Sequence, residues 1–183
     1  MAFAANLLMV VLELLGLYQV RSMLSWKLVV FYTQLSNLIA FGTSVLFLFL
    51  PAGELVLLRY LSTCMLMMTF CVTAFVLIPM GGKPEKLLLS GNGLYHHLLC
   101  PLLSLASYVF FEKHITSFWA VLLPAGITLF YGLTMVALNA KRLVDGPYPF
   151  FKIKQQSALA TVVWMAALTG VIALISLALA CIP

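Results

Sequence analysis

Four polar side chains interrupt a long apolar stretch in the sequence FYTQLSNLIA, which covers residues 31–40. They are Thr33, Gln34, Ser36 and Asn37. In a helix, Thr33, Ser36 and Asn37 share one face, because residues three and four positions apart lie above one another. A threonine hydroxyl attacks an ester carbonyl when a neighbouring base removes its proton. Thr33 is therefore a candidate nucleophile, and Ser36 and Asn37 are candidate donors to the oxyanion that the attack creates.

A candidate base lies in the sequence YHHLLCP at residues 95–101. Imidazole ionises near neutral pH, which suits a general base, and we assign that role to His97. Its neighbour His96 points to a different face of a helix, where we expect it to meet the lipid headgroups as a supporting residue. Pro101 has no backbone N–H, so the carbonyl of His97, one turn earlier, loses its helical partner. We expect a bend and a cavity near His97, since an unpaired carbonyl in a membrane needs water, a ligand or another helix.

Each of these roles has a plainer alternative. Thr33 could instead bond back to a carbonyl one turn earlier, a common habit of threonine in membrane helices that the sequence alone favours. Glu13 could orient a histidine, carry a proton or remain a protonated packing residue, and the sequence does not separate these roles. The loop KRLVDGPYPFFKIK at residues 141–154 mixes bases with aromatics. We interpret it first as an anchor at the membrane interface and second as a holder of a lipid headgroup.

The elements that must position these side chains follow from composition. The chain has 183 residues, of which 64% are hydrophobic and 8% charged. A soluble domain of this size could not cover so much apolar surface, so we expect one all-α membrane domain over residues 1–183. Each predicted span approaches the roughly 20 residues that cross a bilayer. The six spans are residues 3–20, 28–50, 55–79, 93–111, 116–138 and 157–181. Within the third span, we expect Arg59 to reach outward to the membrane surface.

The net charge of +5 reports orientation rather than a nucleic-acid partner, because the basic residues lie in loops between apolar stretches. The first, third and fifth loops carry Arg21, Lys27, Lys83, Lys86, Lys141, Arg142, Lys152 and Lys154. The opposite side carries Arg59 and Lys113. This bias predicts that both termini lie on the non-cytoplasmic side. The chain shows no Cys/His spacing typical of zinc, and we expect neither a metal nor a cofactor.

This topology brings the scattered polar residues to similar depths. Measured from the cytoplasmic ends of their spans, Thr33 lies roughly 8 Å deep and His97 roughly 6 Å deep. Glu13 and Tyr131 come out roughly 10 Å from the same face. We therefore expect one pocket that opens toward the cytoplasmic leaflet and holds all four residues.

Three short motifs occur in order: aromatic-Thr-x-x-Ser-Asn at residues 32–37, His-x-x-x-Pro at 97–101 and Pro-Tyr-Pro-Phe at 147–150. Together they resemble a group of bacterial multi-pass membrane proteins that is distantly similar to the androgen-induced-protein and ADTRP family. That family comprises intramembrane hydrolases that cleave fatty acid esters of hydroxy fatty acids with a threonine and a histidine. The resemblance implies Thr33 as the nucleophile and His97 as its partner, in a bacterial cytoplasmic membrane rather than the endoplasmic reticulum. The chain departs from these proteins at Ser104 and Ser107, where they often carry an acid.

The sequence thus predicts an intramembrane lipid ester hydrolase, in which Thr33 attacks a membrane lipid or acyl ester and His97 takes the proton. The main alternative is a lipid-binding or transport protein in which Glu13 and His97 relay protons. A third alternative is a structural subunit of a larger complex, and assembly into a homo-oligomer stays open. A short distance between Thr33 and His97 would favour the hydrolase over both.

Overall fold

The computed structural model describes residues 2–21, 27–112, 115 and 117–182. Six helices are long and apolar enough to cross a membrane, and the described residues include no strand, so the prediction of an all-α multi-pass membrane protein is confirmed. The six spanning segments are Ala2–Gln19, Tyr32–Phe49, Val56–Leu77, Gly91–Phe111, Trp119–Ala140 and Ala158–Ala180. Their main helices are α1 (Ala2–Gln19), α3 (Tyr32–Phe49), α4 (Val56–Val72), α7 (Cys100–Phe111), α8 (Leu122–Ala140) and α9 (Ala158–Ala180).

Shorter helical segments connect or extend these six. They are α2 (Lys27–Val30), η2 (Ala52–Glu54), η3 (Thr73–Leu77), α5 (Pro84–Leu87), α6 (Gly91–Gly93), η4 (Leu94–Leu99), η5 (Phe118–Val121), η6 (Pro149–Phe151) and η7 (Ile153–Gln155). Two of them, η3 and η4, are π-helical turns that continue α4 and precede α7. Such turns insert an extra residue into a helix and are frequent at functional sites.

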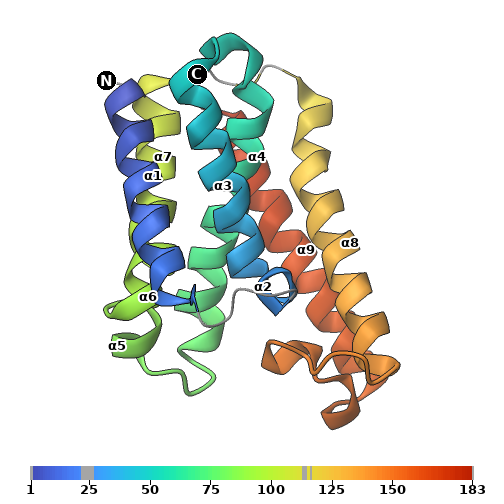
Figure 1. The fold of residues 1–183 in the computed structure, drawn as a ribbon. Coiled ribbons are helices and arrows are strands. Elements are labelled where there is room, and N and C mark those ends of the chain that lie inside the picture. Colours follow the sequence, from blue (N-terminus) through green and yellow to red (C-terminus); the bar gives the residue numbers. More distant parts are fainter. Residues whose placement is uncertain (1, 22–26, 113–114, 116, 183) are drawn as a thin grey trace.

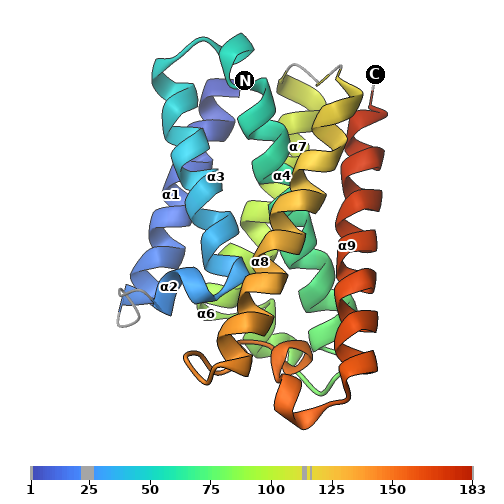
Figure 2. The same cartoon turned by 90° about the vertical axis from the view of Figure 1, so that its right-hand side faces the viewer.

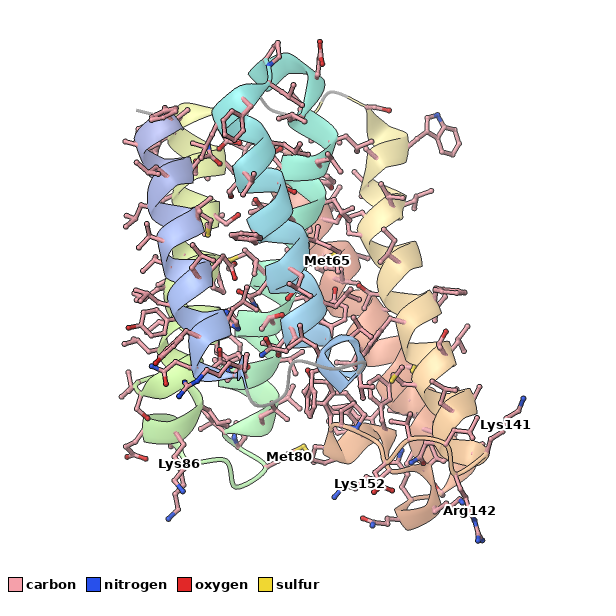
Figure 3. The ribbon with its side chains drawn as sticks, in the orientation of Figure 1. Met65, Met80, Lys86, Lys141, Arg142 and Lys152 are labelled. Atoms are coloured by element: carbon pink, nitrogen blue, oxygen red, sulfur yellow. The ribbon has the colours of Figure 1, made fainter. Side chains whose placement is uncertain are left out.

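Helix α4 is the centre of the bundle. It packs against α3, α7, α8 and α9, while α1 closes the bundle beside α3 and α7 (Figures 1 and 2). The two termini lie at one end, as an even number of spans requires (Figure 1). Lys86, Lys141, Arg142 and Lys152 all lie at the other end (Figure 3), which we call the basic end.

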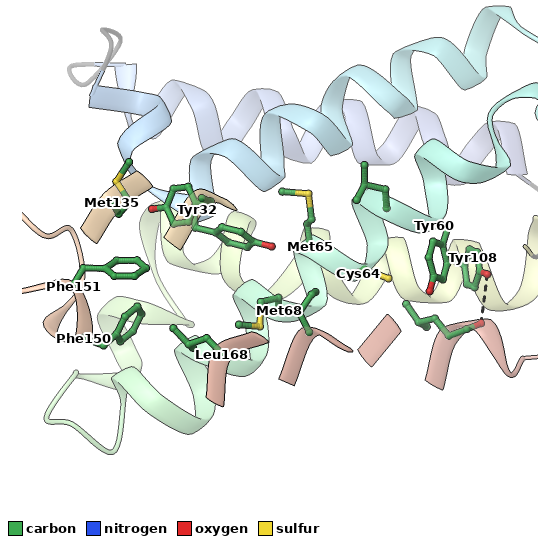
Figure 4. Packing of buried hydrophobic residues seen from close by; sticks show 14 of the residues in the cluster. Tyr32, Tyr60, Cys64, Met65, Met68, Tyr108, Met135, Phe150, Phe151 and Leu168 are labelled. Atoms are coloured by element: carbon green, nitrogen blue, oxygen red, sulfur yellow. Dashed lines mark hydrogen bonds between the residues drawn. The ribbon is translucent and has the colours of Figure 1, made fainter. Parts of the chain in front are cut away.

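The bundle is apolar outside and carries its polar side chains inside. Phe130 on α8 is 73% exposed and Leu174 on α9 is 69% exposed, which suits contact with lipid rather than water. By contrast, the polar face of α3 is buried against its neighbours. The apolar core runs along α4 from Tyr60 and Tyr108 to Phe150 near the basic end (Figure 4). The outer surface of the bundle is therefore suited to lipid, whereas the polar side chains of α3 are buried inside it.

The expectation that Arg59 reaches out of the membrane is wrong. Its side chain is completely buried, and Nε donates to Glu112 Oε2 at 2.8 Å. The guanidinium also donates to Asn6 Oδ1 on α1, and its Nη1 lies 3.4 Å from Ser44 Oγ on α3. Arg59 stays inside because acceptors from other parts of the bundle replace the headgroups that it would otherwise have to reach.

Candidate functional site

Thr33 lies in the first turn of α3, where helical N–H groups have no partner within the helix. Its backbone N–H donates to the hydroxyl of Tyr148 at 3.2 Å, and its Oγ1 lies 3.2 Å from the same hydroxyl. Thr33 is 7% exposed. The hydroxyl of Thr33 is thus paired with the loop between α8 and α9, and the expected bond back to a carbonyl is replaced by this contact.

Tyr148 is the residue that sequence reasoning missed. It was visible only as part of the Pro-Tyr-Pro-Phe motif, in a loop interpreted first as a membrane anchor. In the structure the next aromatics, Phe150 and Phe151, are buried at 3% exposure, so they pack in the core rather than at an interface. Burial raises the pKa of the Tyr148 phenol, although its hydrogen bonds to Thr33 partly oppose this. Tyr148 therefore presents a protonated hydroxyl to Thr33 at neutral pH.

Ser36 and Asn37 hold the backbone of Thr33. Ser36 Oγ donates to the Thr33 carbonyl at 2.9 Å, and Asn37 Nδ2 donates to the same carbonyl at 2.7 Å. Asn37 Nδ2 also lies 3.3 Å from the carbonyl of His96, and Ser36 Oγ lies 3.0 Å from Thr69 Oγ1. Because these donors are already engaged, the two side chains position Thr33, and the geometry does not favour them as oxyanion donors.

The π-helical turn η4 sets the directions of both histidines. The N–H of Cys100 donates to the carbonyl of Tyr95, five residues earlier. A π turn pairs residues five apart, so the missing N–H of Pro101 leaves the carbonyl of His96 without a helical partner. In an α-helix, which pairs residues four apart, the unpaired carbonyl would be that of His97. Asn37 supplies the donor to His96 from α3. The predicted defect exists, but the π register moves it by one residue.

His97 is half-buried and oriented by the backbone of Leu87. Its Nδ1 lies 2.7 Å from the Leu87 carbonyl. A carbonyl only accepts, so the proton of a neutral His97 sits on Nδ1 and Nε2 keeps its lone pair. This tautomer is the one in which Nε2 can take a proton from another group.

We expected His96 to face the lipid headgroups, and this expectation is wrong. Its side chain is completely buried, and Nε2 lies 3.4 Å from Glu13 Oε2 on α1. The approach is possible because Gly16, one turn after Glu13, has no side chain: a Cβ there would collide with the imidazole of His96. Glu13 therefore lies beside His96 rather than His97, although the two side chains make no hydrogen bond with each other.

Two cavities meet at Thr33. The larger has a volume of about 560 Å³ and is lined by Thr33, Gln34, Asn92, His97 and Tyr148, among others. It lies toward the basic end, since Met80, which also lines it, is found there (Figure 3). The smaller has a volume of about 40 Å³, lies between α3, α4, α8 and α9, and includes Tyr131. Thr33, Leu77 and Tyr148 line both cavities and form the wall between them.

No family model, curated protein or solved structure matches this chain. Thr33 and His97 line one cavity, as the depth estimate predicts. The expectation of a single pocket for four residues is wrong, because Tyr131 lines only the smaller cavity and Glu13 lines neither. Among the described residues, no group of three or more His, Cys, Asp or Glu side chains is placed to hold a metal ion.

Proposed function

We propose that this protein is an intramembrane lipid ester hydrolase with Thr33 as the nucleophile and His97 as the general base. The observation that carries the proposal is that both residues line the same cavity of about 560 Å³, with His97 held in the tautomer that leaves Nε2 free. The resemblance to intramembrane threonine hydrolases points to the same pair. A fatty acid ester of a hydroxy fatty acid is the substrate type that this resemblance implies.

In the proposed reaction, Nε2 of His97 takes the proton of the Thr33 hydroxyl as Oγ1 attacks the ester carbonyl. The negative charge moves to the carbonyl oxygen, where the backbone N–H of Thr33 and the O–H of Tyr148 donate hydrogen bonds. In the resting site the Thr33 N–H donates to the Tyr148 oxygen at 3.2 Å, and Oγ1 lies 3.2 Å from the same oxygen. An oxyanion beside Oγ1 would replace the Tyr148 oxygen as the acceptor of this N–H, and the Tyr148 O–H would turn to donate to it. The N-terminal end of α3 adds a favourable dipole for the same charge.

The tetrahedral intermediate collapses when the bond to the leaving oxygen breaks and His97 returns its proton to that oxygen. An acyl group then remains on Thr33. A water molecule, deprotonated by His97, attacks this second ester, and proton return to Oγ1 releases the free acid. Each step uses one base, and no proton or electron is left over.

The proposed orientation puts the basic end in the cytoplasm of a bacterial cell and both termini outside. The gathering of Lys86, Lys141, Arg142 and Lys152 at this end supports it. The larger cavity would then be reached from the cytoplasmic leaflet, where a lipid ester can enter without leaving the membrane.

The experiment that tests the hydrolase is fluorophosphonate labelling and ester turnover of purified protein in nanodiscs. Thr33→Ala and His97→Ala should each abolish both signals. Thr134→Ala is the matched control. Thr134 Oγ1 donates to the carbonyl of Phe130, one turn earlier in the same helix, at 2.8 Å, whereas the Thr33 hydroxyl contacts Tyr148. Turnover that survives in Thr33→Ala would overturn the assignment of the nucleophile.

One observation favours a second candidate, a lipid-binding or transport protein with a proton relay. Glu13 and His96 are fully buried and 3.4 Å apart, which is typical of a proton-carrying pair in a membrane. The relay would then use His96 in place of His97. Proteoliposomes with a pH-sensitive dye inside decide between the candidates: proton flux lost in Glu13→Gln supports transport, whereas flux equal to that of empty liposomes excludes it.

A further inference from the structure

The smaller cavity differs from the larger one in the chemistry of its walls. Three of its hydroxyl groups are engaged with other groups of the protein. The hydroxyl of Tyr32 lies 2.8 Å from that of Thr128, and Tyr131 donates to the carbonyl of Val30 at 2.6 Å. Thr69 Oγ1 likewise donates to the carbonyl of Met65 at 3.2 Å. Most of the other lining residues are apolar or aromatic, among them Met68, Val72, Leu77, Phe150, Phe151 and Leu168, so the wall of this cavity is mainly apolar.

The larger cavity has polar atoms in its wall that lack partners. Gln34 Oε1 and Asn92 Oδ1 are buried and accept no hydrogen bond from the described residues. Gln34 is only 5% exposed, so its carbonyl oxygen requires a donor that the protein does not supply. A polar group of a ligand, or water that accompanies it, would satisfy both oxygens.

The wall between the two cavities includes the residues at which the ester would react. Thr33 and Tyr148 line both spaces, whereas His97 lines only the larger one. In the proposed reaction His97 returns a proton to the leaving oxygen, so the alcohol portion must lie on the side of His97. The acyl portion, which stays attached to Thr33, must then extend the other way.

We propose that the cavity between α3, α4, α8 and α9 binds the hydrocarbon chain of the acyl portion, and that the alcohol portion occupies the larger cavity. This assignment rests on the proposed hydrolase function. It fits the apolar walls, and Figure 4 shows Tyr32, Met68, Phe150, Phe151 and Leu168 around this end of the core.

The volume of the cavity limits how much chain enters without movement. About 40 Å³ corresponds to about three water-sized groups, since one needs roughly 10–15 Å³ by this measure. Two of the lining residues are Met68 and Met165, whose unbranched side chains change shape readily. A short acyl chain fits the cavity as it stands, and a longer one displaces the Met165 side chain.

Gly132 offers a direct way to close this cavity. It lies on α8 opposite Met165, and a Cβ at Gly132 would occupy the place of the Met165 terminal methyl group. Gly126 lies on the same helix with nothing within 4 Å of an added Cβ. Gly132→Val therefore fills the cavity, and Gly126→Val is a control that makes the same change facing open space.

The test uses fatty acids of four, eight and sixteen carbons with a terminal diazirine, photolysed with purified protein in nanodiscs. We expect cross-links on lining residues such as Met68, Met165 and Leu168. Gly132→Val should lower them about ten-fold, as one methylene in a tight apolar pocket can, and Gly126→Val should not. Met165→Ala, which cannot clash, should raise labelling by the sixteen-carbon probe.

Equal cross-linking in wild type and Gly132→Val would overturn the assignment of the cavity, as would cross-links confined to lipid-facing residues such as Leu174. The same preparations are labelled with fluorophosphonate, which reports on Thr33 without any acyl chain. Cavity cross-links without fluorophosphonate labelling would support the chain-binding site and contradict the hydrolase function. Fluorophosphonate labelling, together with equal cross-linking in wild type and Gly132→Val, would support the hydrolase function and contradict the chain-binding site.

Discussion

Arg59 and Glu112 form an ion pair of 2.8 Å whose side chains are only 1% and 2% exposed, inside a bundle with an apolar exterior. Ser107 Oγ donates to Glu112 Oε1 at 2.6 Å, and Asn6 and Ser44 share the guanidinium. The network links α1, α3, α4 and the end of α7 at the end of the bundle that carries the termini. Thr33 lies in the first turn of α3, whereas Ser44 lies toward the other end of that helix, so the network is separate from the candidate site.

Removing one member of this pair should destabilise the protein strongly. Arg59→Met leaves the Glu112 carboxylate buried without its cation, at a cost of about 3–5 kcal/mol. The double change Arg59→Met with Glu112→Leu removes both charges and should recover most of that loss. Thermal unfolding in detergent measures the order of stability. A double variant less stable than Arg59→Met would show that the hydrogen bonds, rather than the paired charges, are what matters.

The hydroxyl of Tyr148 should matter for catalysis more than for folding. Tyr148→Phe keeps the ring that packs beside Phe150 but removes the donor to Thr33. We expect kcat to fall by about 10²-fold with little change in KM, as for the loss of one oxyanion donor. Tyr18→Phe, at an exposed position on α1, is the control. A change in KM alone would instead indicate a role in binding.

Stability at high pH should depend on the same phenol. Because burial raises the pKa of Tyr148, the folded protein keeps the proton at a pH where the unfolded chain, with an ordinary value of about 10, loses it. The stabilisation is thus complete below about pH 10 and decreases as pH rises above it. The free energy of unfolding, measured from pH 8 to 11, should fall more steeply for wild type than for Tyr148→Phe. Parallel curves would mean that the phenol titrates normally.

Gly16 should be intolerant of any side chain. Gly16→Ala drives a Cβ into the imidazole of His96 and separates it from Glu13, which should cost about 1–3 kcal/mol. Gly42→Ala on α3 meets nothing within 4 Å and should be neutral or slightly stabilising, because alanine favours a helix. The measurement is the free energy of unfolding of each variant under the same conditions. Equal stability would mean that α1 shifts freely away from His96.

The sequence by itself determined the class of fold and part of the site. Six stretches of hydrocarbon length predict six helices, because the lipid requires backbone groups to bond within each helix whatever its neighbours are. Helical spacing likewise puts Thr33, Ser36 and Asn37 on one buried face. The depth of each residue in the membrane, estimated from the helical rise per residue, predicts that Thr33 and His97 lie at the same level, and both line the larger cavity.

Only the tertiary structure decided the partners. Tyr148 meets Thr33 from 115 residues away, and Glu112 meets Arg59 from 53 residues away. Such pairs depend on how the helices rotate about their axes and how loops fold back, and neither follows from a local pattern. The π turn at Leu94–Leu99 and the small Gly16 together turned His96 toward Glu13 rather than the headgroups. Depth along a helix is a local quantity, whereas the direction that a side chain faces is set by the packing of the whole bundle.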